Sequence, residues 1–212
     1  MRILALLSLL FAFSANAQNG TAEGVMKMMG ALDQRASQAQ NEGNYVRAEE
    51  SRRQLISLME KTNFQPSEIA RQLSNLASVL NLIDKPEEAE IILERALGLL
   101  DSDPASDKVQ LAVLNGNLGE ALLKQGKHDS ARARYEDELD TLRELSMEST
   151  HFSASAHIGI GTIEAELGKF DKALIHYEFA IPIFRSISDD SHPVTRRVLR
   201  EYEEIQRKAN GQ

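Results

Sequence analysis

The sequence predicts an all-α protein, a right-handed α-solenoid of about four helix-turn-helix repeats followed by a C-terminal capping helix. The main observation is an internal repeat: 42 residues separate Ala89 from Ala131 and Ala131 from Ala173, within similar segments. A weaker copy stands upstream at Ala48. No stretch of useful length alternates apolar and polar residues as a strand does. A repeat of this length made of two helices is typical of a solenoid, in which neighbouring repeats bury one continuous core.

Residues 1–17 have the pattern of a secretory signal peptide. Arg2 is followed by a mainly apolar run from Ile3 to Phe13, and Ala15-Asn16-Ala17 supplies small residues before a cleavage site. The apolar run is shorter than the ~20 residues that a membrane-spanning helix needs. The chain also has no cysteine to carry a lipid. We therefore expect an exported protein that resides in the periplasm, with secretion as the alternative, and no stable membrane insertion after cleavage.

The rest of the chain divides into a leader, four helix pairs and a final helix. Residues 18–30 contain three glycines and no stable helical period, which predicts a flexible leader. The solenoid domain is expected over residues 31–208. Its repeats are predicted at 31–61, 67–100, 107–145 and 153–187, and the capping helix at 192–208.

Proline and glycine mark the expected helix ends. Prolines in the breaks between pairs lie at or just before a helix start, where the missing N–H costs nothing. Gly126 and Gly168 follow the first helices of the third and fourth pairs, and glycine accepts the left-handed conformation that ends a helix. Asp84 and Gly43 occupy the same place in the second and first pairs.

Small residues recur where paired helices are expected to cross, and large residues stand beside them. Small residues let two helices approach closely. The aligned copies carry Leu76-Ala77, Leu118-Gly119 and Ile160-Gly161 in their first helices and Leu93, Tyr135 and Tyr177 in their second helices. The copies depart from this pattern at Arg52, Asn115, His157 and Glu164.

These spacings resemble the tetratricopeptide repeat family. The resemblance is carried by Leu76-Ala77, Ala89, Leu93 and Ala96, and by Ile160-Gly161, Gly168, Lys169-Phe170, Ala173, Tyr177 and Ala180. The 42-residue period is similar to the long repeats of kinesin light chains, as is Ser191-His192-Pro193 followed by Thr195. The resemblance implies a helical solenoid that binds other proteins.

The resemblance also implies a concave groove, lined by the first helix of each pair, that takes an extended peptide or a helix. The residues expected to face it are Ser74, Asn75, Ser78, Asn81, Gly116, Asn117, Glu120, Lys124, Ile158, Thr162 and Glu166. Asn75 and Asn117 match asparagines that bond a ligand's backbone in related repeats. Gly159 interrupts this ladder, and the basic cluster that some relatives use to hold a terminal carboxylate is not assembled.

No motif of a catalytic centre is present: HExxH, Walker and GxSxG patterns are missing, and there is no thiol. We therefore expect no catalytic residues, no metal and no cofactor. Weaker alternatives are a methionine site at Met26, Met28 and Met29, a histidine site around His151, His157 and Glu164, and an acidic cluster of Glu120, Glu164 and Glu166.

The net charge of −8 gives no bulk attraction for nucleic acid or anionic membrane. Arg196, Arg197 and Arg200 form one basic cluster, which we interpret as a solvated helix face. The sequence thus predicts a non-catalytic adaptor in the bacterial envelope with a protein or peptide partner. A self-assembling homo-oligomer is the first alternative, and a metal-dependent or hydrolytic enzyme is the second.

Overall fold

The protein is described by a computed structural model that covers residues 2–101 and 107–211, with side chains from Thr21 onward. Within these residues the regular secondary structure is entirely helical. The helices are α1 (Arg2–Asn41), α2 (Tyr45–Lys61), α3 (Pro66–Leu82), α4 (Pro86–Asp101), α5 (Lys108–Lys124), α6 (His128–Glu144), α7 (His151–Glu166), α8 (Phe170–Ile187) and α9 (Pro193–Ala209). The predicted all-α fold of repeated helix pairs is confirmed.

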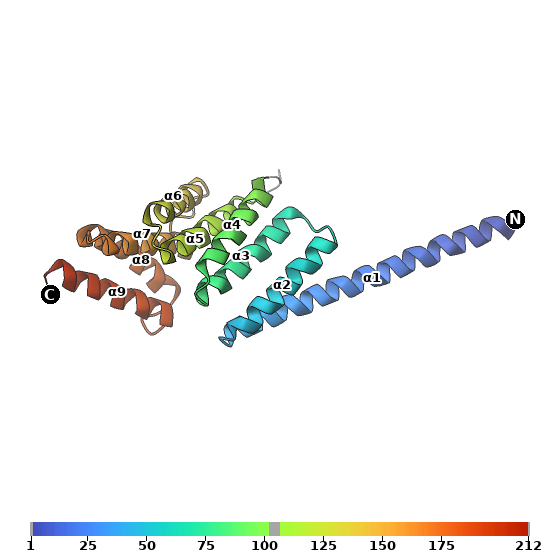
Figure 1. Cartoon of the computed structure of the whole chain (residues 1–212), viewed down its shortest axis with the longest axis horizontal. Coiled ribbons are helices and arrows are strands. Elements are labelled where there is room, and N and C mark those ends of the chain that lie inside the picture. The colour runs from blue at the N-terminus through green and yellow to red at the C-terminus, as the bar shows by residue number, and fades with distance from the viewer. Residues whose placement is uncertain (1, 102–106, 212) are drawn as a thin grey trace. The chain divides into compact units, whose positions relative to one another are not determined.

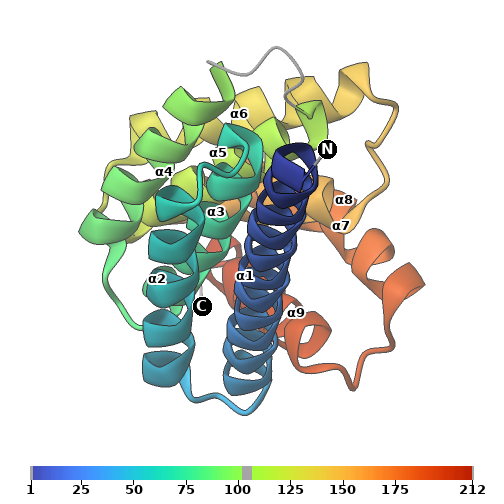
Figure 2. The same cartoon turned by 90° about the vertical axis from the view of Figure 1, so that its right-hand side faces the viewer.

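The chain forms two compact units, Met1–Phe64 and Gln65–Gln212. In the first unit α1 and α2 lie side by side and pack against each other (Figure 2). In the second unit α3 packs on α4, α5 on α6, α7 on α8, and α9 on α8 (Figure 1). The first helices also pack against one another, α3 on α5 and α5 on α7. This order of contacts is that of an α-solenoid.

The same turn ends the first helix of every pair. Gly43, Asp84, Gly126 and Gly168 have positive φ angles of 73°, 60°, 71° and 73°. In each turn the N–H of the following residue donates to the carbonyl five positions earlier, at 2.8 to 3.0 Å. This is the hydrogen bond of a helix that ends in a left-handed residue. The left-handed glycine ends predicted from the sequence are therefore confirmed, and each turn sends the second helix back along the first.

Small residues lie where helices of a pair meet, as the repeat predicted. A Cβ atom at Gly119 would stand 2.8 Å from Cε1 of Tyr135, and one at Gly161 would stand 2.9 Å from Cδ2 of Tyr177. The alanines that define the 42-residue repeat are completely buried. Each tyrosine ring thus lies directly on the backbone of the first helix of its pair.

The leader is the part of the described chain that differs most from expectation. Residues 18–30 were expected to be flexible, but α1 runs through them without a break. Gly24 and Gly30 each cost a helix about 1 kcal/mol relative to alanine, a small penalty among methionines that favour helix. Met29 is buried, whereas Met26 and Met28 are exposed.

The predicted signal peptide, residues 1–17, lies outside the residues whose side chains are described, and it stays a prediction. A search of the described residues finds no helix with a stretch both long and apolar enough to cross a membrane.

Candidate binding groove

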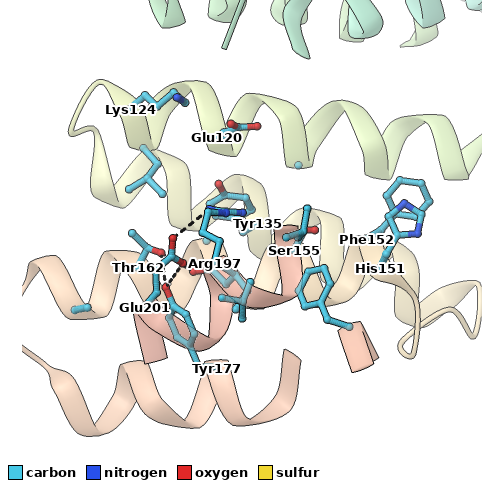
Figure 3. A pocket seen from close by; sticks show the side chains of 18 of the residues that line it. Glu120, Lys124, Tyr135, His151, Phe152, Ser155, Thr162, Tyr177, Arg197 and Glu201 are labelled. Atoms are coloured by element: carbon cyan, nitrogen blue, oxygen red, sulfur yellow. Dashed lines mark hydrogen bonds and ion pairs between the residues drawn. The ribbon is translucent and has the colours of Figure 1, made fainter. Parts of the chain in front are cut away.

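A groove with a volume of about 700 Å³ lies in the second unit, between the first helices of the last repeats. Its walls are residues of α5, α7 and α9 (Figure 3). Side chains from the second helices also reach it, Tyr135 and Glu138 from α6 and Tyr177 and Phe184 from α8. The groove is therefore built by three successive elements of the solenoid and by the side chains behind them.

Seven of the residues expected to face a groove line this one. They are Gly116, Asn117, Glu120 and Lys124 on α5, and Ile158, Thr162 and Glu166 on α7. The four expected residues on α3 lie outside it: Ser74, Asn75, Ser78 and Asn81. The expected residues of α5 and α7 thus lie together along this groove and those of α3 do not, and their role in binding a partner stays a prediction.

Ser74 and Asn81 connect α3 to α5. Both side chains are buried. The amide Nδ2 of Asn117 donates to Oγ of Ser74 at 2.9 Å, and Nδ2 of Asn81 donates to the backbone oxygen of Asn117 at 3.3 Å. The side-chain amide of Asn117, which we expect from the sequence to bond a ligand, thus already donates a hydrogen bond to a neighbouring helix. Spacing within one segment of the chain does not predict such a bond, because it depends on which helix lies alongside.

Two glycines at the groove leave space for side chains of α6. A Cβ atom at Gly116 would stand 2.5 Å from Oε2 of Glu138, and one at Gly159 would overlap the ring of Tyr135. Gly159, which the sequence analysis treated as a gap in an asparagine ladder, is instead where the Tyr135 ring lies against α7. The sequence pattern does not assign Tyr135 and Glu138 to the groove. A signal for Glu138 is present in the sequence, because a glutamate stands at a repeat position that both neighbouring copies fill with alanine.

Two carboxyl groups in this groove have perturbed acidity. Glu138 is 3% exposed, and burial raises its pKa to about 8. Burial also raises the pKa of Glu120, while the charges of Lys124 and Arg197 and a hydrogen bond from Asn81 act in the opposite direction. The carboxyl group of Glu138 in the floor of the groove is therefore protonated near neutral pH.

A polar network ties α9 to α7 and α8 (Figure 3). The hydroxyls of Thr162 and Tyr177 are 3.1 Å apart. Tyr177 donates to Oε2 of Glu201 at 3.1 Å, and Nη1 of Arg197 donates to Oε1 of Glu201 at 3.2 Å. Burial raises the pKa of Tyr177, which keeps its hydroxyl a donor. The helix that the sequence analysis interpreted as a solvating cap thus forms a wall of the groove.

The acidic cluster, one of the weaker alternatives from the sequence, does not assemble. Glu120 and Glu166 line the groove, and Oε2 of Glu166 lies 2.6 Å from Nε2 of His128. Glu164 is buried outside the groove, where its Oε1 lies 2.9 Å from Nη2 of Arg132. Glu164 and Glu166 lie on different faces of α7, because residues two apart along a helix do not face the same side.

The histidines near this site are also separate from one another. His151 lines the groove. His157 instead faces α8, where its Nδ1 lies 3.0 Å from Nδ1 of His176, and burial lowers the pKa of His157 to about 4. In the parts of the chain that the structure describes, no three histidine, aspartate or glutamate residues are arranged to hold a metal ion.

The remaining departures from the repeat have local explanations. Arg52, at a position expected to be aromatic, is buried in the first unit and pairs with Asp33 of α1 at 2.7 Å. Asn115 is buried between the helices of the second unit, and its Oδ1 has no hydrogen-bond donor among the described residues.

Comparison with known proteins agrees with this fold. A tetratricopeptide repeat model matches residues 68–144. The chain is 27% identical over 106 residues to Protein KINESIN LIGHT CHAIN-RELATED 1 of Arabidopsis thaliana, across 50% of this chain. The alignment covers only 17% of that relative, so the chain spans a small part of its length.

Solved structures share the architecture over most of the chain. The crystal structure of BtubC (BKLC) from P. vanneervenii matches with a TM-score of 0.71 and 18% identity, covering 92% of this chain and 79% of that one. The apo form of RapI matches with a TM-score of 0.68 and 17% identity, covering 86% of this chain and 64% of that one. At these identities the likeness is one of fold, a solenoid of the tetratricopeptide repeat type.

Proposed function

We propose that this protein is a non-catalytic protein-interaction module that holds an extended segment of a partner protein in the groove between α5, α7 and α9. The observation that carries the proposal is the groove itself, about 700 Å³ in volume and lined by first helices of successive repeats. Solenoids of this type are generally protein-interaction modules, and their stacked repeats form extended concave surfaces.

The chemistry of the groove suits a peptide segment. Phe152, Ile158 and Phe184 supply apolar surface for side chains, while Asn117 and Glu120 place polar groups beside it. An extended segment carries unpaired backbone N–H and C=O groups along its length, and polar groups in the groove can pair with them. The binding free energy would come mainly from the buried apolar side chains, and the polar groups would set register.

We further propose that the partner resides in the bacterial envelope. The support is the N-terminal pattern of residues 1–17, with its apolar segment and small residues before the cleavage position. The lack of cysteine is compatible with folding in an oxidising compartment without disulfide bonds.

A crosslinking experiment tests the groove. A photoreactive side chain is placed at Ser155, which is exposed and lines the groove, and in a control protein at Ala133, which is exposed on α6 outside it. We expect one dominant envelope protein to be captured from Ser155 and not from Ala133. Binding of the purified partner should then be weakened by Ser155→Trp and unaffected by Ala133→Trp.

Other outcomes contradict the proposal. Capture of further copies of the same chain, with a concentration-dependent mass in sedimentation, would support the self-assembly alternative. Equal capture from Ser155 and Ala133 would show that the groove is not the selective surface.

A further inference from the structure

Glu138 occupies a position that the two neighbouring copies of the repeat fill with alanine. Its equivalents, 42 residues before and after, are Ala96 and Ala180, and both are completely buried. Glu138 is also buried, at 3% exposure, but carries a carboxyl group. The space for that carboxyl comes from Gly116, where even a methyl group would stand 2.5 Å from Oε2.

The neighbouring copies lack this space. The positions equivalent to Gly116 are Ser74 and Ile158, each of which carries a side chain. The third pair therefore combines a buried glutamate with the glycine that accommodates it. The two changes together create a carboxyl-lined recess in the floor of the groove.

This carboxyl group has no partner. Among the described residues none donates a hydrogen bond to Glu138 or forms an ion pair with it. Three other acidic side chains at the groove have partners: Glu166 with His128, Glu201 with Arg197 and Tyr177, and Glu204 with Lys208. Burying a polar group without a hydrogen bond costs roughly 1–3 kcal/mol or more, so such groups are rare in native proteins.

We propose that Glu138 receives the cationic side chain, arginine in preference to lysine, of the segment held in the groove. The inference rests on the proposed function and specifies which segment fits. A carboxylate offers two oxygens that match the two parallel N–H groups of a guanidinium, and such bidentate pairs are among the strongest hydrogen bonds in proteins. Glu120 is a second acidic side chain that lines the same groove, whereas the nearby Arg197 is already paired with Glu201.

Binding a cation should release a proton. The pKa of Glu138 is raised to about 8, so the empty site holds a proton at neutral pH, and a guanidinium would displace it. The charged or titratable groups that line the groove with Glu138 are Glu120 and Lys124 on α5, Tyr135 on α6, His151 and Glu166 on α7, Tyr177 on α8, and Arg197, Glu201, Glu204 and Lys208 on α9. Comparison with a Glu138→Gln variant isolates the contribution of Glu138.

The test measures peptide selectivity of the purified full-length protein. The probe is a set of short synthetic peptide libraries, random except for one central residue fixed as arginine, lysine, citrulline or glutamate. Citrulline has the shape of arginine without its charge. Wild-type protein and Glu138→Gln are compared, with Glu136→Gln as the matched control because Glu136 is exposed on the same helix.

We expect wild type to favour arginine over citrulline by about tenfold or more, the value of a hydrogen bond to a charged group. Glu138→Gln should lose this preference and the rise of affinity with pH, and Glu136→Gln should keep both. Peptide binding without a preference for arginine, or a preference that survives in Glu138→Gln, would overturn the inference and leave the proposed function standing. Failure to bind any of the libraries would contradict the proposed function, and the inference with it.

Discussion

At the scale of single residues, three glycines decide which side chains of α6 enter the groove. Gly116 admits the carboxyl of Glu138, and Gly119 and Gly159 lie against the ring of Tyr135. Glycine is needed here for close approach and not for backbone conformation, because each of the three lies within a helix. Glycine inside a helix costs about 1 kcal/mol relative to alanine. At these positions that cost leaves space for the side chains of Glu138 and Tyr135.

Replacing Gly159 with alanine should therefore destabilise the protein. A Cβ at this position would overlap the Tyr135 ring, and overpacking of this kind costs typically ~1–3 kcal/mol. Urea unfolding followed by circular dichroism measures the change. The control is Gly98→Ala in α4, where a Cβ meets nothing within 4 Å and should stabilise by about 0.5–1 kcal/mol. If both variants gained stability, Tyr135 would not lie against α7.

The buried carboxyl of Glu138 predicts a pH dependence of stability. Its pKa is about 8 in the folded protein, against 4.5 for an ordinary glutamate. Between these values the folded state holds a proton that the unfolded state has lost, so its contribution to stability is complete below pH 4.5 and declines as pH rises towards 8. Glu138→Gln should thus gain stability relative to wild type between about pH 5 and pH 8, by roughly 1.4 kcal/mol for each pH unit crossed in that window.

Unfolding free energies at several pH values measure this difference, with Glu136→Gln as the control that should follow wild type. Parallel profiles for wild type and Glu138→Gln would show that the carboxyl is solvated.

The residue scale is also where the sequence was least informative. Asn117 lies along the groove, but its hydrogen bond to Ser74 depends on a neighbouring helix. The recess at Glu138 depends on which glycine faces the carboxyl group.

At the scale of helices, spacing along the chain predicted the arrangement of helix pairs well, because the first helix of each pair ends in the same turn. The left-handed turn at Gly126 recurs at Gly168, 42 residues later. Glycine adopts the positive φ angle of this turn readily, so its presence in the sequence indicates the turn. The role of α9 was not predictable in this manner. It has no partner copy in the repeat, and its polar residues suggested solvent, yet Arg197 and Glu201 face the groove.

Packing of α9 on α8 can be tested with two substitutions on one helix. Ile205 is buried in the cluster that contains Tyr177 and Ile181, whereas Val194, also on the groove, is exposed. Ile205→Ala should cost roughly 2 kcal/mol or more, because it removes buried methyl groups and leaves a cavity. Val194→Ala should change stability by less than about 0.5 kcal/mol. Thermal unfolding separates these outcomes, and an equal, small effect of both would mean that α9 is not docked in solution.

At the scale of the whole molecule, the repeat predicted more than the composition did. The alanines at 42-residue intervals implied stacked helix pairs, and the second unit has this order from α3 to α8. The chain nevertheless divides after Phe64 into two compact units, which a continuous repeat pattern does not indicate. The first pair differs chemically, since Arg52 pairs with Asp33 where later pairs place a leucine or tyrosine.

The last prediction concerns the N-terminal segment. If residues 1–17 are a signal peptide, the folded protein should not need them. Among the described side chains of α1, the first buried one is Met29, followed by Ala36 and Ala39. A protein that begins at Gln18 should therefore unfold at the same temperature as the full-length chain, measured by circular dichroism. N-terminal sequencing of protein recovered from the periplasm should find Gln18 first. A midpoint several degrees lower would mean that the removed residues pack against the rest of the protein, which a cleaved signal cannot do.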